Sequence, residues 1–88
     1  MKLTPAVEAD VQLRLARIEG QVRGVRRMLE EGRGCSDVVR QICAMRAALG
    51  KVAAAVVAEN LEECVRRGVA DGDEEPVAAA KRALLELI

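Results

Sequence analysis

The chain has 88 residues, 51% of them apolar, with neither a histidine nor an aromatic side chain. This length favours one small domain whose core is marginal alone and is commonly supported by association with another copy. Without histidine, a carboxylate pair or a glycine-rich phosphate loop, the sequence argues against a hydrolase, a transferase or a metalloenzyme, and we expect no enzyme, no resident metal and no cofactor.

The first predicted helix spans about residues 5–31. Thr4 can cap its N-terminus ahead of Pro5, which suits the first helical position, and the two glycines of "EGRG" at 31–34 end it. Its apolar residues recur every three or four positions, as in an amphipathic helix with a coiled-coil-like stripe. They are Val7, Val11, Leu15, Ile18, Val22, Val25 and Leu29.

A second stripe predicts an unusually long helix over residues 35–68. It consists of Val38, Ile42, Met45, Leu49, Val52 and Val56, and no breaker interrupts it before Gly68. A helix of this length is about 50 Å long, whereas a compact monomer of this size would have a radius of gyration of only about 12 Å. We therefore expect a second copy of the chain to cover the overhanging part.

The last predicted helix spans about residues 74–88, because the acids ahead of Pro76 suit a helix start. Its apolar residues are expected to dock it onto the other two helices; they are Val77, Ala80, Leu84 and Leu87. The sequence has no strand pattern and no internal repeat. Residues 1–88 are therefore predicted to form one all-α domain, a three-helix protomer that completes an antiparallel four-helix bundle with a second subunit.

Extending the stripe of the 35–68 helix in both directions places Cys35 and, through Asn60, Cys64 on the same packing seam. The two thiols are roughly 44 Å apart on one rod, while a disulfide needs Cα atoms within about 7 Å. One chain cannot join them. In an antiparallel two-fold dimer, Cys35 of one subunit comes opposite Cys64 of the other, so the spacing predicts a site between subunits.

The two positions have different effects on a thiol. Cys35 follows a glycine turn at the start of its helix, where free N–H groups, the helix dipole and nearby Arg33 favour a thiolate; it is the candidate nucleophile. Cys64 lies in the last turn beside two glutamates, which disfavour a thiolate, and is the candidate resolving thiol. Cysteine is also a frequent core residue, so spacing alone leaves open that both simply pack. Cys43 is expected to be a buried apolar residue.

The segment "RLARIEGQVRGVRRMLEEGRGCSDVVRQICAMRAAL", residues 14–49, resembles the signature region of the copper-sensitive operon repressor family, small all-helical bacterial transcriptional repressors. The resemblance covers almost the whole chain. Its most specific parts are "RIEGQVRG", the glycine turn before Cys35, and "MRAAL". It implies dimers that pair into a flat tetramer, and repression by binding double-stranded operator DNA until an inducer reaches the cysteine site between subunits.

Copper sensors of this family use Cys, His and Cys as ligands, and this chain has Asn60 where the histidine would be. An amide is a poor ligand for soft Cu(I). The Cys-Asn-Cys pattern is similar to the persulfide-sensing branch, the CsoR-like sulfurtransferase repressors, whose two thiols become linked between subunits by di-, tri- or tetrasulfide bridges. Reactive sulfur species are then the implied inducer. The alternatives are a Cu(I)-responsive repressor that uses the two thiolates, and a helical oligomerisation module with inert cysteines.

Positive charge gathers in the first part of the chain, with nine Lys and Arg against four acids in residues 11–51 and four against eight in residues 52–88. Charge alone fits a solvated helix face as well as a surface for a polyanion. Arg14, Arg17 and Gln21 share one face of the first helix. The resemblance implies that this face, together with the arginine at Arg46, contacts operator DNA through phosphates and guanine edges.

The sequence also bears on location. No apolar run approaches the ~18 residues of a membrane span, and the N-terminus lacks the apolar stretch of a signal peptide. We therefore expect a cytoplasmic protein whose three cysteines are reduced at rest.

Overall fold

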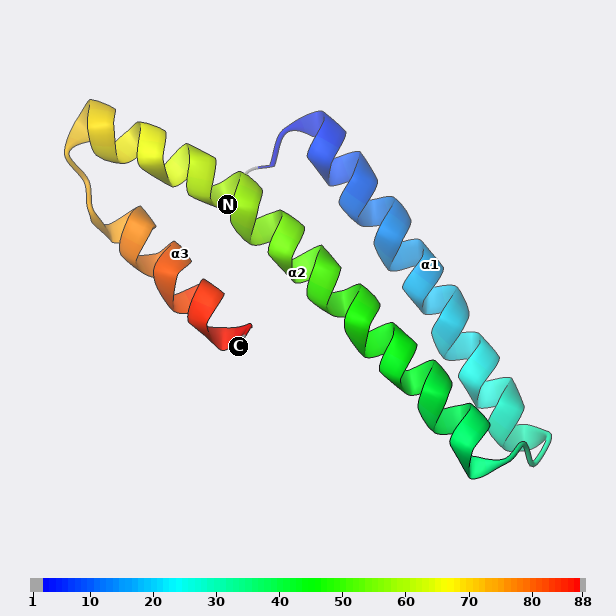
Figure 1. Ribbon diagram of the computed structural model, residues 1–88. Helices are drawn as coiled ribbons and strands as arrows, with labels where there is room; N and C mark the ends of the chain where they lie inside the picture. The colour runs from blue at the N-terminus through cyan, green and yellow to red at the C-terminus, as the bar shows by residue number, and fades with distance from the viewer. Residues whose placement is uncertain (1–2, 88) are drawn as a thin grey trace.

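The computed structural model describes residues 3–87, which form three helices. α1 spans Pro5–Glu30, α2 spans Cys35–Asp71 and α3 spans Glu75–Glu86; Ile88, the predicted last helical residue, lies outside the described range. The predicted all-α, three-helix protomer is confirmed. α2 is the spine: α1 runs antiparallel along one side of it, and α3 folds back along the other side of its C-terminal part (Figure 1).

Both ends of α1 follow from local sequence. The Thr4 hydroxyl accepts a hydrogen bond from a backbone N–H of the first turn (3.4 Å), and a proline occupies that turn. At the other end Gly32 has a left-handed backbone (φ 69°), and the Arg33 N–H bonds to the Met28 carbonyl at 2.9 Å. This Schellman-type ending lets the chain reverse direction and begin α2 at once.

α2 extends beyond its predicted end at Gly68. It continues to Asp71 and stops at Gly72, whose left-handed backbone (φ 66°) suits a helix C-cap and whose N–H bonds to the Gly68 carbonyl at 3.1 Å. Gly68 lies inside the helix, where a Cβ would be 3.7 Å from the Asp73 carbonyl oxygen. The prediction placed the stop at the wrong glycine, because only Gly72 adopts the backbone conformation that ends a helix.

The protomer is a flat arrangement of helices. Its principal extents are 57 × 26 × 12 Å and its radius of gyration is 17.2 Å, against about 12 Å for a compact chain of this size. Three helices side by side at 8–10 Å spacings account for the width. A core normally lies between two packed layers, and here it is small: Val11, Ile18 and Val52 form it between α1 and α2, and no large side chain among residues 3–87 is fully buried.

Large apolar side chains remain exposed along α2, because its neighbours cover only part of its circumference. They include Val39, Ile42, Leu49, Leu61, Val65 and Val69. By length and composition α2 also passes for a membrane span, since an 18-residue window has a mean hydropathy of 1.4 and at most two charged residues. The expectation that no apolar run approaches this length is therefore wrong. Uncovered apolar surface of this extent is also typical of a protein-protein interface.

α3 packs on α2 alone, and the prediction that it docks on both other helices is wrong. Within residues 3–87, α1 and α3 do not touch, because α3 lies on the other side of α2 from α1 (Figure 1). Ala80, only 3% exposed, anchors it, and Val77 is half-buried, whereas Leu84 and Leu87 are exposed. α3 is therefore held mainly through its first half.

Candidate functional site: two thiols and a basic groove

Cys35 and Cys64 lie on the same continuous helix, 29 residues apart. At 1.5 Å per residue they are separated by roughly 44 Å, whereas the Cα atoms of a disulfide lie within about 7 Å. All three cysteines are free thiols. An unbroken α2 excludes a bridge within one chain, so any chemistry that joins these two thiols must join different subunits.

Cys35 is an open thiol at a helix terminus. It is the first residue of α2 and is exposed. The N-cap residue, Gly34, provides no side-chain hydrogen bond, so unpaired backbone N–H groups and the positive end of the helix dipole lie near the sulfur. Arg33 approaches the Asp37 carboxylate (3.6 Å). Of the two sources of positive potential that the sequence predicted at Cys35, Arg33 thus lies near an acid, and the helix terminus is in place beside the thiol.

Cys64 is a covered thiol, with 4% of its surface exposed. Its Sγ donates a hydrogen bond to the carbonyl oxygen of Pro76, 3.1 Å away in the first turn of α3. The two arginines that follow it in α2 each approach an acidic side chain instead. The two thiols therefore differ in exposure, and α3 is what covers the second one; the difference in thiolate stability stays a prediction.

Asn60 precedes Cys64 by one helical turn and is partly buried. A spacing of four places the amide and the thiol on the same face of α2. Within residues 3–87 of one protomer, no three side chains of His, Cys, Asp or Glu gather closely enough to hold a metal ion. A metal at this place would have to take ligands from two subunits.

Cys43 is exposed in the protomer, so the prediction that it is a buried core residue is wrong for the single chain. It follows the buried Val38 by five residues, which turns it about 140° around the helix. It therefore points away from α1, and the periodicity of α2 alone did not say which arc of the helix α1 would cover.

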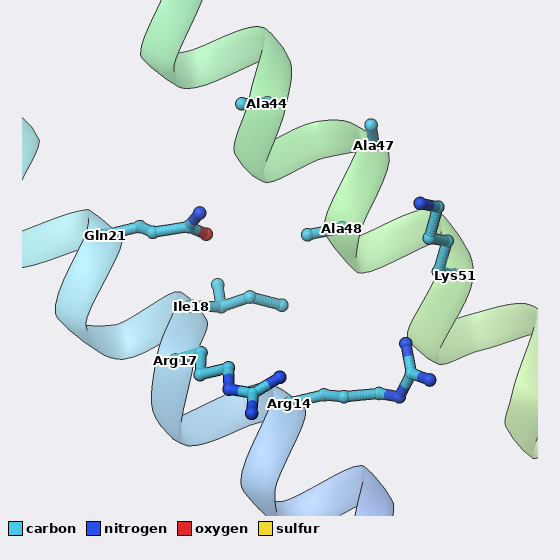
Figure 2. A pocket seen from close by; sticks show the side chains of 8 residues that line it. All are labelled: Arg14, Arg17, Ile18, Gln21, Ala44, Ala47, Ala48 and Lys51. Carbon is cyan, nitrogen blue, oxygen red and sulfur yellow. The ribbon is translucent and has the colours of Figure 1, made fainter.

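Three of the four residues predicted to contact DNA line one groove between α1 and α2. The groove is formed by Arg14, Arg17, Ile18 and Gln21 of α1 and by Ala44, Ala47, Ala48 and Lys51 of α2 (Figure 2). Because the α2 side is mostly alanine, a hollow of about 400 Å³ remains open between the helices. Its lining carries three cations and no carboxylate, so it suits an anionic group such as a phosphate.

Arg14 is partly neutralised by an acid at the edge of this groove. Its Nε lies 2.9 Å from the Asp10 carboxylate, one turn earlier in α1, and both side chains are about half exposed. An exposed pair of this kind contributes at most about 1 kcal/mol. A phosphate can therefore compete with Asp10 for the guanidinium.

Lys51 is the groove residue that the sequence-based reasoning missed. Arg46, the α2 residue predicted to contact DNA, does not line the groove, because it precedes Lys51 by five positions, which turns it about 140° away around the helix. A signal for Lys51 was present: it is the sole cation between Arg46 and Arg66, in a stretch otherwise dominated by small apolar residues.

Known proteins resemble the chain over nearly its whole length. Residues 8–88 match the family model "Metal-sensitive transcriptional repressor". "Copper-sensing transcriptional repressor RicR" of Mycobacterium tuberculosis (strain ATCC 25618 / H37Rv) is 45% identical over 78 residues, which cover 85% of this chain and 81% of that protein. "Copper-sensing transcriptional repressor CsoR" of Bacillus subtilis (strain 168) is 44% identical over 62 residues, covering 70% and 61%.

Two solved structures share the fold. "The nickel-responsive transcriptional regulator InrS" has a TM-score of 0.80 and 38% identity and covers 91% of each chain. The copper-sensing repressor CsoR with Cu(I) from Geobacillus thermodenitrificans NG80-2 has a TM-score of 0.83 and 32% identity, covering 98% of this chain and 90% of that one. These relatives are named for copper or nickel, so the similarities support the predicted family without singling out its persulfide-sensing branch.

Proposed function

Because the chain belongs to the metal-sensitive transcriptional repressor family, we propose that it is an operator-binding repressor whose inducer is a reactive sulfur species acting at Cys35 of one subunit and Cys64 of another. The prediction that it is not an enzyme is confirmed by the family, whose members are transcriptional repressors. A repressor works where the DNA is, which supports the cytoplasmic location.

The assembly we propose is an antiparallel dimer that pairs into a flat tetramer. Support comes from the flat protomer, 57 Å long and 12 Å thick, and from the apolar side chains exposed along α2. A second antiparallel copy would cover that surface and bring the open Cys35 to the other subunit's Cys64. The sensing site is incomplete without this partner.

The observation that carries the choice of inducer is the side chain at Asn60. The proposed site holds two thiols and an amide, and an amide oxygen is a poor ligand for Cu(I). Two thiols, one open at a helix N-terminus and one covered, suit sulfur transfer followed by resolution. The asymmetry between exposed Cys35 and buried Cys64 supports Cys35 as the site of the first step.

The proposed reaction balances without a further oxidant. The Cys35 thiolate attacks the outer sulfur of a persulfide RS–SH, forming Cys35–S–SH and releasing the thiol RSH. The thiolate of Cys64 on the other subunit then attacks the Cys35 Sγ, forming the disulfide and expelling hydrogen sulfide, which takes up the proton. If Cys64 has itself become a persulfide, the same attack produces a trisulfide and hydrogen sulfide.

A Cu(I)-responsive repressor that uses the same two thiolates is the second candidate. It is favoured by the names of the relatives, two of which are copper-sensing repressors at 44–45% identity. Considered alone, those similarities favour copper over sulfur. The amide at Asn60 opposes this reading, because it leaves only two thiolates for the metal.

The basic groove is the DNA-contacting surface that we propose. Arg14, Arg17 and Gln21 of α1 and Lys51 of α2 converge on it, which provides positive charge and amide donors for phosphates. In a symmetric assembly each groove is repeated, so several phosphates are neutralised at once and binding falls steeply with salt. Arg46 lies outside the groove and stays a predicted DNA contact.

One experiment separates the candidates. Reduced protein bound to a duplex selected for its affinity is treated separately with a persulfide donor, hydrogen peroxide or Cu(I), and DNA affinity and intact mass are measured. We expect the persulfide donor alone to crosslink Cys35 to Cys64 between subunits through two or more sulfur atoms and to weaken binding at least tenfold, about 1.4 kcal/mol.

The other outcomes decide against this proposal. Release of DNA by Cu(I) but not by the persulfide donor assigns the chain to the copper sensors despite Asn60. Binding that ignores all three treatments identifies the cysteines as inert. A crosslink formed with peroxide as readily as with persulfide makes the protein a general thiol-oxidation sensor.

A further inference from the structure

We propose that α3 is a latch operated by Cys64: the reduced thiol holds the start of α3 against α2, and covalent modification or deprotonation of that thiol releases it. This inference rests on the proposed function only in that Cys64 is a reacting group. The same release follows whether the inducer is a persulfide or Cu(I), because both replace the thiol proton.

The contact between α3 and α2 is concentrated near Cys64. The thiol donates to the Pro76 carbonyl at 3.1 Å, and Ala80, one turn later, is 3% exposed. The rest of α3 is weakly held, since Leu85 is 63% exposed, and within residues 3–87 the helix has no contact with α1. The position of α3 therefore depends on α2 alone, through this hydrogen bond and the packing of Val77 and Ala80.

Modification of Cys64 conflicts with this arrangement in two ways. Once Cys64 is a persulfide, a disulfide or a thiolate, its Sγ carries no proton and cannot donate to the Pro76 oxygen. It presents lone pairs to that oxygen instead. An attached sulfur also needs volume beside a side chain that is only 4% exposed. Both effects push the first turn of α3 away from α2.

α3 can move without disturbing the rest of the protomer. The core cluster of Val11, Ile18 and Val52 lies between α1 and α2, and the chain enters α3 through a turn that begins at the left-handed Gly72. Before Cys35 of another subunit can reach the sulfur of Cys64, the cover that α3 provides must open. The latch therefore guards the resolving thiol and converts its reaction into a movement of α3.

Amide hydrogen exchange of peptides covering residues 75–87 tests the latch in the full-length protein. We expect exchange there to be at least about tenfold faster in the crosslinked protein than in the reduced protein, while peptides of α1 keep their protection. Unchanged protection of α3 in protein shown by mass to be crosslinked at Cys64 overturns the inference, although the proposed sensing function would stand.

Variants test the same contact without any inducer. Cys64→Ala removes the donor and should speed α3 exchange at least about threefold in the untreated protein, whereas Cys64→Ser keeps an O–H donor and should retain most of the protection. Cys43→Ser, at an exposed position, is the matched control and should leave α3 unchanged. Equal α3 protection in Cys64→Ala, Cys64→Ser and the unmodified chain would also overturn the latch, even if persulfides crosslink the subunits as proposed.

Discussion

Cys35 and Cys64 occupy one unbroken helix, and their separation of 29 positions keeps them roughly 44 Å apart. Cys35 is exposed, and Cys64 is covered by α3. A helix cannot fold back to join its own ends, so in the function we propose one protomer contributes half of each of two sites. That proposal makes assembly of the chain a condition for its chemistry.

We therefore expect the chain to be a stable dimer or tetramer at micromolar concentration. The physical reason is the flat protomer, 12 Å in its smallest extent, which leaves apolar side chains such as Ile42 and Leu49 about half exposed. Sedimentation equilibrium measures the assembly directly. A folded species of 9.5 kDa at that concentration would contradict it.

Removing a cation from the basic groove should weaken DNA binding without unfolding the helices. We expect Arg14→Ala, Arg17→Ala and Lys51→Ala each to reduce affinity about tenfold and to lower the slope of affinity against salt, because each loses a phosphate contact. Arg46→Ala should have a smaller effect, since Arg46 lies outside the groove. Fluorescence anisotropy over a salt series provides both quantities. Arg82→Ala, on α3, is the control; an equal loss there would mean that only net charge matters.

Releasing Arg14 from its acid should have the opposite effect. In the unmodified chain the Asp10 carboxylate lies 2.9 Å from the Arg14 guanidinium. Asp10→Asn removes that carboxylate and with it a negative charge at the edge of the groove. We expect DNA affinity to rise about two- to fivefold, within the range of an exposed ion pair. The same salt series measures it. If affinity does not change, or falls, Asp10 is not competing with phosphate for Arg14.

The identity of residue 60 should decide the preference between sulfur and copper. Asn60→His supplies an imidazole one turn before Cys64, and imidazole with two thiolates makes a three-ligand set that suits Cu(I). We expect the variant to bind Cu(I) at least about a hundredfold more tightly than the unmodified chain, in competition with a chromophoric chelator. Asn60→Gln, which keeps an amide, is the control and should show no gain. Equal Cu(I) affinity in all three proteins would mean that residue 60 is not at the site.

The end of α2 offers a test of stability. Gly72 has φ 66°, a region that disfavours residues with a Cβ, so Gly72→Ala should lower the free energy of unfolding by about 1 kcal/mol. Gly24→Ala is the matched control: Gly24 lies within α1 and a Cβ there meets nothing within 4 Å, so the change should stabilise the helix by up to about 1 kcal/mol. Urea unfolding followed by circular dichroism must be compared at one protein concentration, because association adds to stability. Similar effects of both substitutions would contradict this account of the helix end.

Sequence alone determined the helices of this protein and the position of each residue along its own helix. The cap at Thr4, the glycine turn after α1 and the three-and-four spacing of apolar residues are local signals, and local backbone chemistry is enough to interpret them. The same reasoning placed Cys35 and Cys64 on one rod and Arg14 beside Arg17. These predictions needed only the rise and twist of a helix.

Only the tertiary structure decided how the helices face one another. It put Lys51 rather than Arg46 in the groove with Arg14, left Cys43 exposed, and laid Pro76 over Cys64. Periodicity defines an apolar face but not which neighbour covers which arc of it; that depends on how the side chains of both helices interlock. The stop of α2 also needed the tertiary structure. Both Gly68 and Gly72 could end a helix, and only the path of the chain into α3 shows that Gly72 adopts the left-handed backbone.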